Sequence, residues 1–368
     1  MNRPAYLAAI ESMLERIRSE HRYRELPSRQ LSGVVDFSSN DYLGLAGDPQ
    51  VVAALRNATR AGSGGARLLG GRHREHSLLE EELAAWLGRE RALLFSSGYH
   101  AAIGAIPALA PAFDAIYSDE RNHASLIDGV RLSRVARVVY PRGAPPVPQE
   151  GVRALVVGES LHGMDGDVQD PSALLERLGA GGALLLDEAH ALGVLGAQGA
   201  GLAGDLRDER VLVMGTLSKA LGSHGGFVAG PAPAIELLVN RARSFVFDTA
   251  LPPALALAAR IGIALARRAG DRRAALAENA RRLRRGLRDA GLDVPDAPGP
   301  IVAPLLGSEE RALRLCAALL ERRIYVPAIR PPTVPPGTSR LRFSVRSDHR
   351  AEQIDLAVEE VRACIATS

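Results

Sequence analysis

Two stretches decide the fold: ALLLDEAH at Ala183–His190 and VLVMGTLSK at Val211–Lys219. Each begins as a short, wholly apolar run and ends in polar residues. Such a run indicates a strand that is buried on both faces, as the strands of parallel sheets are. Because the carboxyl ends of parallel strands lie along one edge of the sheet, we expect Asp187, His190 and Lys219 to face one crevice.

Further apolar runs predict more strands of the same sheet, and helical patterns separate them. These runs are residues 92–95, 115–117, 136–140, 154–157 and 226–229. Alternation of buried strands with helices is typical of an α/β domain with a large, mostly parallel sheet. The pattern then becomes long and helical over residues 254–290.

The two ends of the chain predict separate elements. Residues 1–26 form a helical pattern with Leu7, Ile10, Leu14 and Ile17 on one stripe. After the proline-rich stretch 294–300, the pattern predicts a smaller α+β segment. We expect an N-terminal arm over residues 1–40, a large α/β domain over 41–270 and a small C-terminal α+β domain over 271–368.

The last helix of this C-terminal segment is predicted from an amphipathic stripe. It carries Ile354, Val358, Val361 and Ile365. Ser347 or Asp348 would cap its N-terminus, because serine and aspartate side chains accept hydrogen bonds from the first free amides of a helix.

The composition excludes some classes of protein. Of the 368 residues, 46% are hydrophobic and 24% charged, as in ordinary globular proteins. The two cysteines are too few for a disulfide framework, so we expect a reducing, cytoplasmic location. No apolar stretch is long enough to cross a bilayer, and we expect no membrane partner.

The basic residues are almost all arginine. Lysine and arginine together number 45, and Lys219 is the only lysine. The arginine runs over residues 267–285 alternate with leucines at helical spacing. We interpret them as a solvated helix face and expect no nucleic-acid partner, because no aromatic residues lie among them to stack on bases.

The single lysine suggests a chemical role. Arginine replaces lysine in surface ion pairs, but it does not lose its proton and attack a carbonyl group. An amine with an adjustable pKa does so, which makes lysine the Schiff-base residue. Chance retention of one lysine is the alternative.

The residues around Lys219 suit pyridoxal 5′-phosphate (PLP). This cofactor needs a carboxylate at its ring nitrogen, here Asp187, and a lysine at its aldehyde. The turn Ser96–Tyr99 follows a predicted strand and opens a helix, so its backbone amides can receive the phosphate. The glycine cluster at residues 62–71 lacks the spacing of nucleotide-binding loops, and no metal site is expected.

Ordered motifs along the chain resemble those of the α-oxoamine synthases. They are residues 37–45 (FSSNDYLGL), 62–65 (GSGG), 122–125 (NHAS), 164–167 (MDGD), 187–190 (DEAH), 216–219 (TLSK) and 329–342 (IRPPTVPPGTSRLR). The resemblance covers the chain from about Arg24 onward. It implies the PLP-dependent transferase fold type I, which is aspartate aminotransferase-like.

The resemblance also implies roles for single residues. Lys219 would carry the cofactor, Asp187 would pair with the pyridinium nitrogen, and His190 would bond the phenolic oxygen. His123 would stack on the ring beside the substrate. Other cofactor contacts would be Thr216, Gly98, Tyr99, Gly163 and Thr249. Substrate contacts would be Arg342, which holds the amino-acid carboxylate, with Asn40, Thr333 and Arg24.

Two positions depart from the family pattern. The family has an aromatic residue and a serine before Met164, where this chain has His162 and Gly163. Restoring serine at 163 is expected to add a donor to the cofactor worth about 1 kcal/mol. The segment between Tyr140 and Ala154 also looks short, and its prolines preclude the helix expected there.

The C-terminal motif resembles the member of the family that condenses L-alanine with a pimeloyl thioester, either pimeloyl-CoA or a pimeloyl-carrier protein, in biotin biosynthesis. The alternatives are a glycine C-acetyltransferase-type synthase, an aminotransferase of the same fold, and a PLP-fold binding or regulatory protein without catalysis. Residues 247–253, which include Thr249, resemble the segment that reaches the neighbouring subunit's phosphate. The resemblance therefore implies a homodimer with shared active sites.

Overall fold

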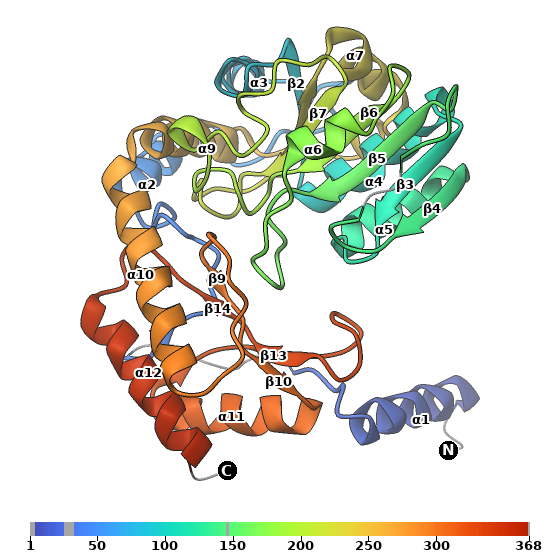
Figure 1. Cartoon of the computed structure of the whole chain (residues 1–368). Helices are drawn as coiled ribbons and strands as arrows, with labels where there is room; N and C mark the ends of the chain where they lie inside the picture. The colour runs from blue at the N-terminus through green and yellow to red at the C-terminus, as the bar shows by residue number, and fades with distance from the viewer. Residues whose placement is uncertain (1–3, 26–32, 145–146, 367–368) are drawn as a thin grey trace.

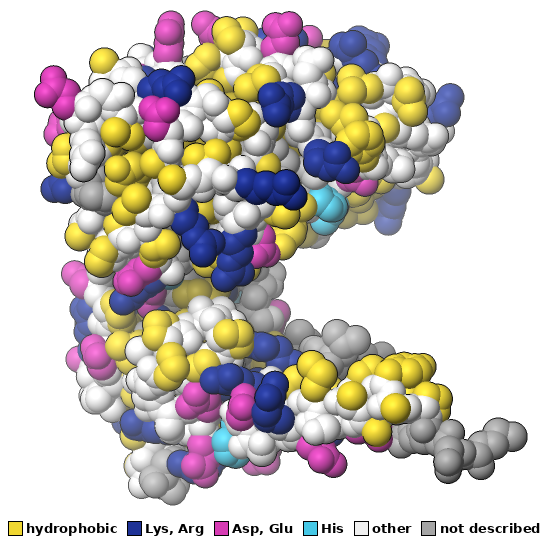
Figure 2. All heavy atoms as spheres, turned by 90° about the vertical axis from the view of Figure 1, so that its right-hand side faces the viewer, with side chains coloured by type: hydrophobic (Ala, Val, Ile, Leu, Met, Phe, Trp, Pro, Cys, Tyr) yellow, Lys and Arg dark blue, Asp and Glu magenta, His cyan; other side chains and the backbone are white. Residues whose placement is uncertain are grey.

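The computed structural model describes residues 4–25, 33–144 and 147–366. Figure 1 shows two bodies, one built on a large sheet and one formed by the C-terminal segment. Figure 2 shows a hollow between them on the side from which helix α1 (Ala5–Ser19) projects. No helix in these ranges is both long and apolar enough to cross a bilayer.

The central sheet has seven strands in the order β2-β8-β7-β6-β5-β3-β4. Their bounds are β2 Arg91–Phe95, β3 Ala115–Asp119, β4 Ala136–Tyr140, β5 Ala154–Glu159, β6 Ala183–Asp187, β7 Val211–Thr216 and β8 Gly226–Gly230. The pairs from β7 to β4 are parallel, whereas β8 runs antiparallel to both of its neighbours. The prediction of a largely parallel α/β sheet is confirmed.

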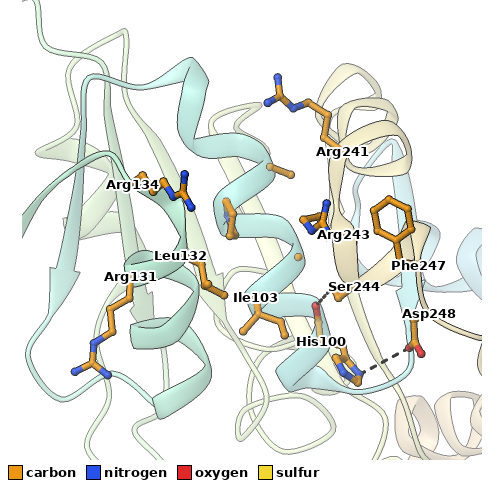
Figure 3. A pocket seen from close by; sticks show the side chains of 13 residues that line it. His100, Ile103, Arg131, Leu132, Arg134, Arg241, Arg243, Ser244, Phe247 and Asp248 are labelled. Carbon is orange, nitrogen blue, oxygen red and sulfur yellow. Dashed lines mark hydrogen bonds and ion pairs between the residues drawn. The ribbon is translucent and has the colours of Figure 1, made fainter.

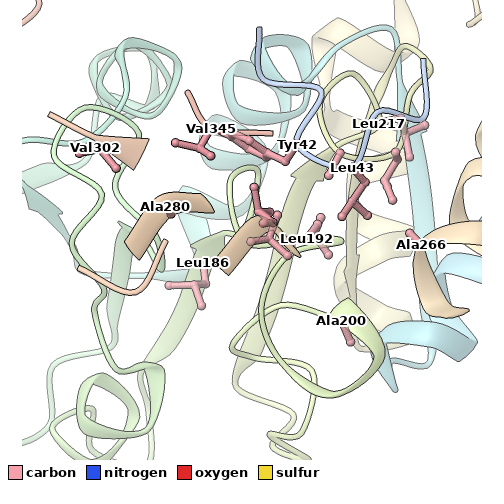
Figure 4. Packing of buried hydrophobic residues seen from close by; sticks show 14 of the residues in the cluster. Tyr42, Leu43, Leu186, Leu192, Ala200, Leu217, Ala266, Ala280, Val302 and Val345 are labelled. Atoms are coloured by element: carbon pink, nitrogen blue, oxygen red, sulfur yellow. The ribbon is translucent and has the colours of Figure 1, made fainter. Parts of the chain in front are cut away.

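Both faces of the sheet are covered by helices. One face packs on α4 Gly98–Leu109, α5 Ala124–Ser133, α7 Ala232–Arg241 and α8 Arg243–Val246, and the other on α3 Arg74–Leu87 and α9 Pro253–Arg268. Each face of the sheet has its own hydrophobic core: the first lies under α4, α5, α7 and α8, and the second under α3 and α9. In β6, Leu185 lies in the first core, and Leu184 and Leu186 lie in the second. This follows from the two-residue period of a strand. Figure 4 shows Leu186 in the second core together with Tyr42 and Leu217.

The expectation that every strand is buried on both faces is wrong for β4. Its first four residues are exposed, and only Tyr140 is buried. β4 pairs with β3 alone and forms one edge of the sheet. An apolar run does not reveal whether its strand has one neighbour or two, so the sequence could not distinguish the edge strand.

The C-terminal body contains three helices and short strands. The helices are α10 Gly270–Asp289, α11 Glu309–Glu321 and α12 Ala351–Ala366. The strands are β9 Ile301–Val302, β10 Leu305–Gly307, β11 Ile324–Tyr325, β12 Ala328–Ile329, β13 Ser339–Leu341 and β14 Phe343–Ser344. The remaining short elements are β1 Val35–Asp36, α2 Pro49–Arg56, α6 Pro171–Glu176 and the 3-10 turns at 110–112 and 197–199.

Some helix predictions need correction. The helical pattern at 254–290 is two helices, which are separated at Ala269. Ser347 and Asp348 do not cap α12, because they form a turn before it. Instead the side chain of Gln353 accepts a hydrogen bond from the Arg350 amide at 2.9 Å.

The N-terminal helix and the arginine runs also differ from expectation. Helix α1 spans Ala5–Ser19 only, and none of its residues is buried. In α10, Arg281 lies on the solvated face as predicted, but Arg284 is buried. Its guanidinium reaches the carbonyl oxygens of Gly299 and Ile301 at 3.3 and 3.5 Å.

Candidate active site

The centre of the candidate site lies where β6 and β7 end. Asp187 is the last residue of β6 and is paired in register with Met214 of β7, and Lys219 follows three residues after β7. The Glu188 amide donates to the Met214 carbonyl at 2.8 Å and holds the two strand ends together. The expectation that both ends contribute to one site is therefore met in the geometry.

A chain of hydrogen bonds begins at Lys219. Its Nζ lies 2.8 Å from Nε2 of His190, whose Nδ1 lies 2.7 Å from the hydroxyl of Tyr42. Tyr42 in turn donates to Oδ1 of Asn40 at 3.1 Å. Tyr42 and His190 are buried, so this chain fixes the imidazole beside the amine.

Arg342 closes the other side of the site. Its Nη1 donates to Asn40 Oδ1 at 3.1 Å and to the hydroxyl of Ser344 at 2.6 Å, and its Nε donates to the Gly163 carbonyl at 2.6 Å. The side chain is buried, and within the described residues its Nη2 has no hydrogen-bond partner. A fixed guanidinium with one unpaired edge is suited to receive a carboxylate.

The electrostatics of the pair at the strand ends are unusual. Burial raises the pKa of Asp187 to about 7, and the nearby Glu159 carboxylate adds to this effect. Desolvation lowers the pKa of Lys219 to about 8, although Asp187 and Glu159 oppose it. An amine whose pKa lies this close to neutrality provides an unprotonated fraction that can act as nucleophile or base.

The predicted phosphate turn lies next to this centre. Ser97 is the N-cap of α4, and its hydroxyl accepts from the His100 amide at 3.1 Å. A Cβ on Gly98 would lie 3.4 Å from Cβ of Thr216, and one on Gly226 would collide with the backbone of Ser97. The two glycines thus let the turn pack closely against β7 and β8 at the start of α4, where backbone amides could receive an anion.

Tyr99 is at this turn, but its side chain is bonded to a residue outside the turn. Its side chain is exposed, and its hydroxyl donates to Asp128 of α5 at 2.5 Å. Only its backbone amide is placed to serve the turn.

Glu159 is a site residue that the sequence analysis missed. It ends β5 in register with Asp187 and is buried. Its carboxylate accepts from the amide of His123 at 2.7 Å and from the amide of Gly163 at 3.3 Å. An acidic residue two positions after the apolar run at 154–157 was the available signal, similar to the one that identified Asp187 directly after its run.

Gly163 contradicts the expectation that a restored serine would simply add a donor. A Cβ at this position would lie 2.5 Å from Nε2 of His190 and 3.0 Å from its Cδ2. Because both nitrogens of His190 are hydrogen-bonded, the ring is not free to move aside. The glycine is a condition for this placement of His190.

Arg24, Thr333 and Thr249 lie further out. Arg24 donates to the hydroxyl of Thr333 at 3.4 Å, and Thr333 lines a cavity of about 440 Å³ that also reaches Asn122. Thr249 has an exposed side chain, and its carbonyl accepts from Ser96 at 3.3 Å. Among the described residues, neither Thr249 nor Arg24 forms a hydrogen bond with Lys219, Asp187 or His190.

A larger cavity, of about 750 Å³, lies along α4 and does not include the lysine site (Figure 3). Arg131 and Arg134 line one side of it, and Arg241 and Arg243 line the other. His100 and Asp248 lie at one end, 3.9 Å apart. Asp248 also accepts from the hydroxyl of Ser96, which connects this end to the phosphate turn.

The chain is similar to known proteins over most of its length. The family model of class I and II aminotransferases matches residues 32–361. An 8-amino-7-oxononanoate synthase of Anaeromyxobacter dehalogenans is 48% identical over 89% of this chain and 86% of its own. The one from Cellvibrio japonicus is 41% identical over 95% and 94%.

Solved structures give the same result. The 8-amino-7-oxononanoate synthase of Francisella tularensis superposes with a TM-score of 0.81 and 28% identity, covering 91% of this chain and 99% of that one. A serine palmitoyltransferase (SPT) structure with a PLP internal aldimine superposes with a TM-score of 0.88 and 27% identity over 99% of both chains.

Proposed function

Because the chain belongs to the class I and II aminotransferase family, and within it to the 8-amino-7-oxononanoate synthases, we propose that it catalyses their reaction. This is the PLP-dependent, decarboxylative condensation of L-alanine with a pimeloyl thioester, an acyl transfer in biotin biosynthesis. The predictions of an α-oxoamine synthase with fold type I and with PLP as its cofactor are confirmed at this level.

The residues present fit PLP. The ring nitrogen calls for a buried carboxylate, which Asp187 supplies, and the aldehyde calls for an amine, which Lys219 supplies. The phosphate calls for free amides at a helix start, and the glycines at 98 and 226 leave that turn open. When bound, PLP supplies an electron sink for the carbon that loses its proton.

The amino acid would be held by Arg342. We infer that its unpaired Nη2 receives the carboxylate of L-alanine, while Asn40 and Ser344 keep the guanidinium in place. Fixing the carboxylate orients the bonds at Cα relative to the cofactor plane, and such orientation contributes to both rate and selectivity.

Lys219 would move the proton. Its lowered pKa lets the unprotonated amine accept the Cα proton onto Nζ, and His190 at 2.8 Å holds that nitrogen in position. Asp187 would pair with the ring nitrogen of the cofactor and keep it protonated. His123, fixed through its amide by Glu159, would lie beside the incoming acyl group.

The observation that carries this proposal is the Arg342 guanidinium, which is buried, hydrogen-bonded to three residues and, among the residues that the structure describes, without a partner at Nη2. Incubation with L-alanine and pimeloyl-CoA should release CoA and form the amino-ketone. An aminotransferase would release no CoA, and a binding protein would form neither product. A glycine-dependent synthase would instead prefer glycine with a short acyl-CoA.

Lys219 as the attachment point has its own test. Borohydride reduction of the PLP-loaded protein should fix the cofactor to Lys219, and mass spectrometry should find one modified peptide, because no other lysine exists. Modification only at the N-terminal amine would contradict the assignment.

We further propose a homodimer with shared sites in the cytoplasm. Apolar side chains at Leu68, Leu69 and Phe247 are exposed, with Leu69 at 83%. The segments that carry them contact each other, because the Ser63 hydroxyl and the Ala250 carbonyl are hydrogen-bonded. A second chain covering these residues would bury them beside the phosphate turn.

A further inference from the structure

A compact group of possible metal ligands lies beside the candidate active site, in the loop after β5. His162, Asp165 and Asp167 each present one ligand atom, and these atoms all lie within 4.8 Å of one another. His162 Nδ1 is 3.0 Å from Asp165 Oδ2 and 3.5 Å from Asp167 Oδ1. His162 stands where the family has an aromatic residue, so the family pattern does not account for this group.

Two of the three atoms that face one another lack hydrogen-bond donors, while the third, Asp165 Oδ2, accepts from Nη1 of Arg121 at 3.4 Å. His162 is buried, and its Nε2 lies 2.6 Å from the Arg121 carbonyl oxygen, which can only accept. Nε2 therefore carries the proton, and in the neutral ring Nδ1 presents a lone pair. In the part of the chain that the structure describes, Nδ1 and Asp167 Oδ1 are both buried without a hydrogen-bond partner.

In each aspartate, the carboxylate oxygen that points away from His162 is paired with an arginine. Asp165 Oδ1 is paired with Arg340, and Asp167 Oδ2 with Nε of Arg142 at 2.8 Å. Metal ligands are commonly oriented this way: the histidine donates its other N–H to a carbonyl, and the carboxylates are fixed by further donors. Three acceptors directed at one point favour a positive charge between them, in addition to the Arg121 guanidinium beside Asp165 Oδ2.

We propose that His162, Asp165 and Asp167 bind one divalent transition-metal ion. One imidazole nitrogen with two carboxylate oxygens suits Zn²⁺ or Mn²⁺ better than Ca²⁺ or Mg²⁺, which prefer oxygen alone. The ion would fix the 162–167 loop, which His162 already connects to the carbonyl oxygen of Arg121, two residues before His123. This site is independent of the condensation reaction and departs from the expectation of no metal.

The competing occupant is a proton. A doubly protonated His162 would also satisfy both carboxylates, as an ion pair. Arg121 lies 3.4 Å from Asp165 Oδ2 and adds positive charge on that side, which favours the proton over the metal. Measurement of bound metal separates the two directly.

The experiment uses the PLP-loaded protein after treatment with a chelator and dialysis against Zn²⁺. Elemental analysis should find one Zn²⁺ per chain, and calorimetry should give a single class of site. His162→Phe restores an aromatic residue and removes one ligand, so its affinity for Zn²⁺ should fall at least tenfold, and Asp167→Asn should have a similar effect. His100→Phe is the matched control, because His100 also lies near a carboxylate, at 3.9 Å, but outside the group.

Retention of one Zn²⁺ by wild type and His100→Phe, with loss in both ligand variants, would support the proposal. Absence of stoichiometric Zn²⁺ in wild type, or equal binding by His162→Phe, would overturn it in favour of the ion pair. Elemental analysis and calorimetry both measure Zn²⁺ binding without catalysis. The metal site can therefore be tested even if the protein lacks the proposed activity.

Discussion

At position 163 the absence of a side chain is what lets His190 approach Lys219. We expect Gly163→Ser and Gly163→Ala to weaken PLP binding about tenfold each, because the new Cβ would displace a ring that is hydrogen-bonded at both nitrogens. Spectrophotometric titration of the cofactor-free protein with PLP gives the dissociation constants. If serine bound more tightly than wild type while alanine did not, the added hydroxyl would outweigh the collision.

Glu159 has an electrostatic effect that can be tested separately from its hydrogen bonds. Its negative charge raises the pKa of Lys219, which desolvation lowers to about 8. Glu159→Gln removes that charge, so the pKa of Lys219 should fall and its neutral form should persist to lower pH. The pH midpoint of PLP capture by the cofactor-free protein should therefore shift downward.

The control for this shift is Glu188→Gln. Glu188 is buried next to Asp187 in the chain but does not contribute to the pKa of Lys219. A slower capture with an unmoved midpoint in Glu159→Gln would mean that the residue acts through its hydrogen bonds to His123 and Gly163 alone.

At the level of single residues, the sequence was most informative for polar residues that come directly after a predicted strand. It predicted that Asp187, His190 and Lys219 lie close together, and the structure places them at the adjoining ends of β6 and β7. It missed Tyr42 and Ser344, because their contacts join segments far apart in the chain. The hydrogen bond from Ser344 to Asn40 joins residues 304 positions apart, so no local sequence pattern could predict it.

Among the elements, the segment between β4 and β5 has a larger role than its short length suggests. No helix forms over its described residues, as its prolines predict, and Arg142 turns inward from it. The guanidinium donates to Asp167, Asp119 and Gln169, at 2.8 to 3.2 Å. This connection fixes the loop that follows β5.

We expect Arg142→Leu to destabilise the protein by about 3–5 kcal/mol, the usual cost of removing one partner from a buried ion pair. Thermal unfolding should show a clear fall in the midpoint. Arg137→Leu, on the exposed edge strand β4, should change stability by about 0.5 kcal/mol at most. Equal effects of the two substitutions would contradict the buried connection.

Element types were more predictable than element limits. The seven strands of the central sheet were all predicted from short apolar runs, although the strand at 136–140 is mostly exposed. The break between α9 and α10 at Ala269 has no proline to mark it. The cap of α12 depends on the Arg350 amide and Gln353, a pairing that several nearby polar residues could have made equally well.

For the whole molecule, the proposed sharing of sites between two chains predicts recovery of activity in hybrids. Lys219→Ala and Thr249→Ala should each be inactive or nearly so as homodimers. If Thr249 serves the partner's cofactor, subunit exchange would place both lesions in one site and leave the other intact. The mixture should then regain activity toward a fraction of wild type.

The outcome depends on which chain Thr249 serves. The backbone of Thr249 contacts Ser96 of its own chain, whereas its side chain is exposed and available to another. If it serves its own chain, every hybrid site keeps one lesion and the mixture stays inactive. That result would remove the shared site without affecting the chemistry of Lys219.

Because the chain has a single lysine, amine labelling can measure the fraction of protein molecules that carry the cofactor. Reagents that acylate primary amines find only two targets in the folded chain, the α-amino group and Lys219. A cofactor bound to Lys219 would shield the second target. The yield of doubly labelled protein would then report directly, molecule by molecule, how much of a preparation is unloaded, without any engineered tag.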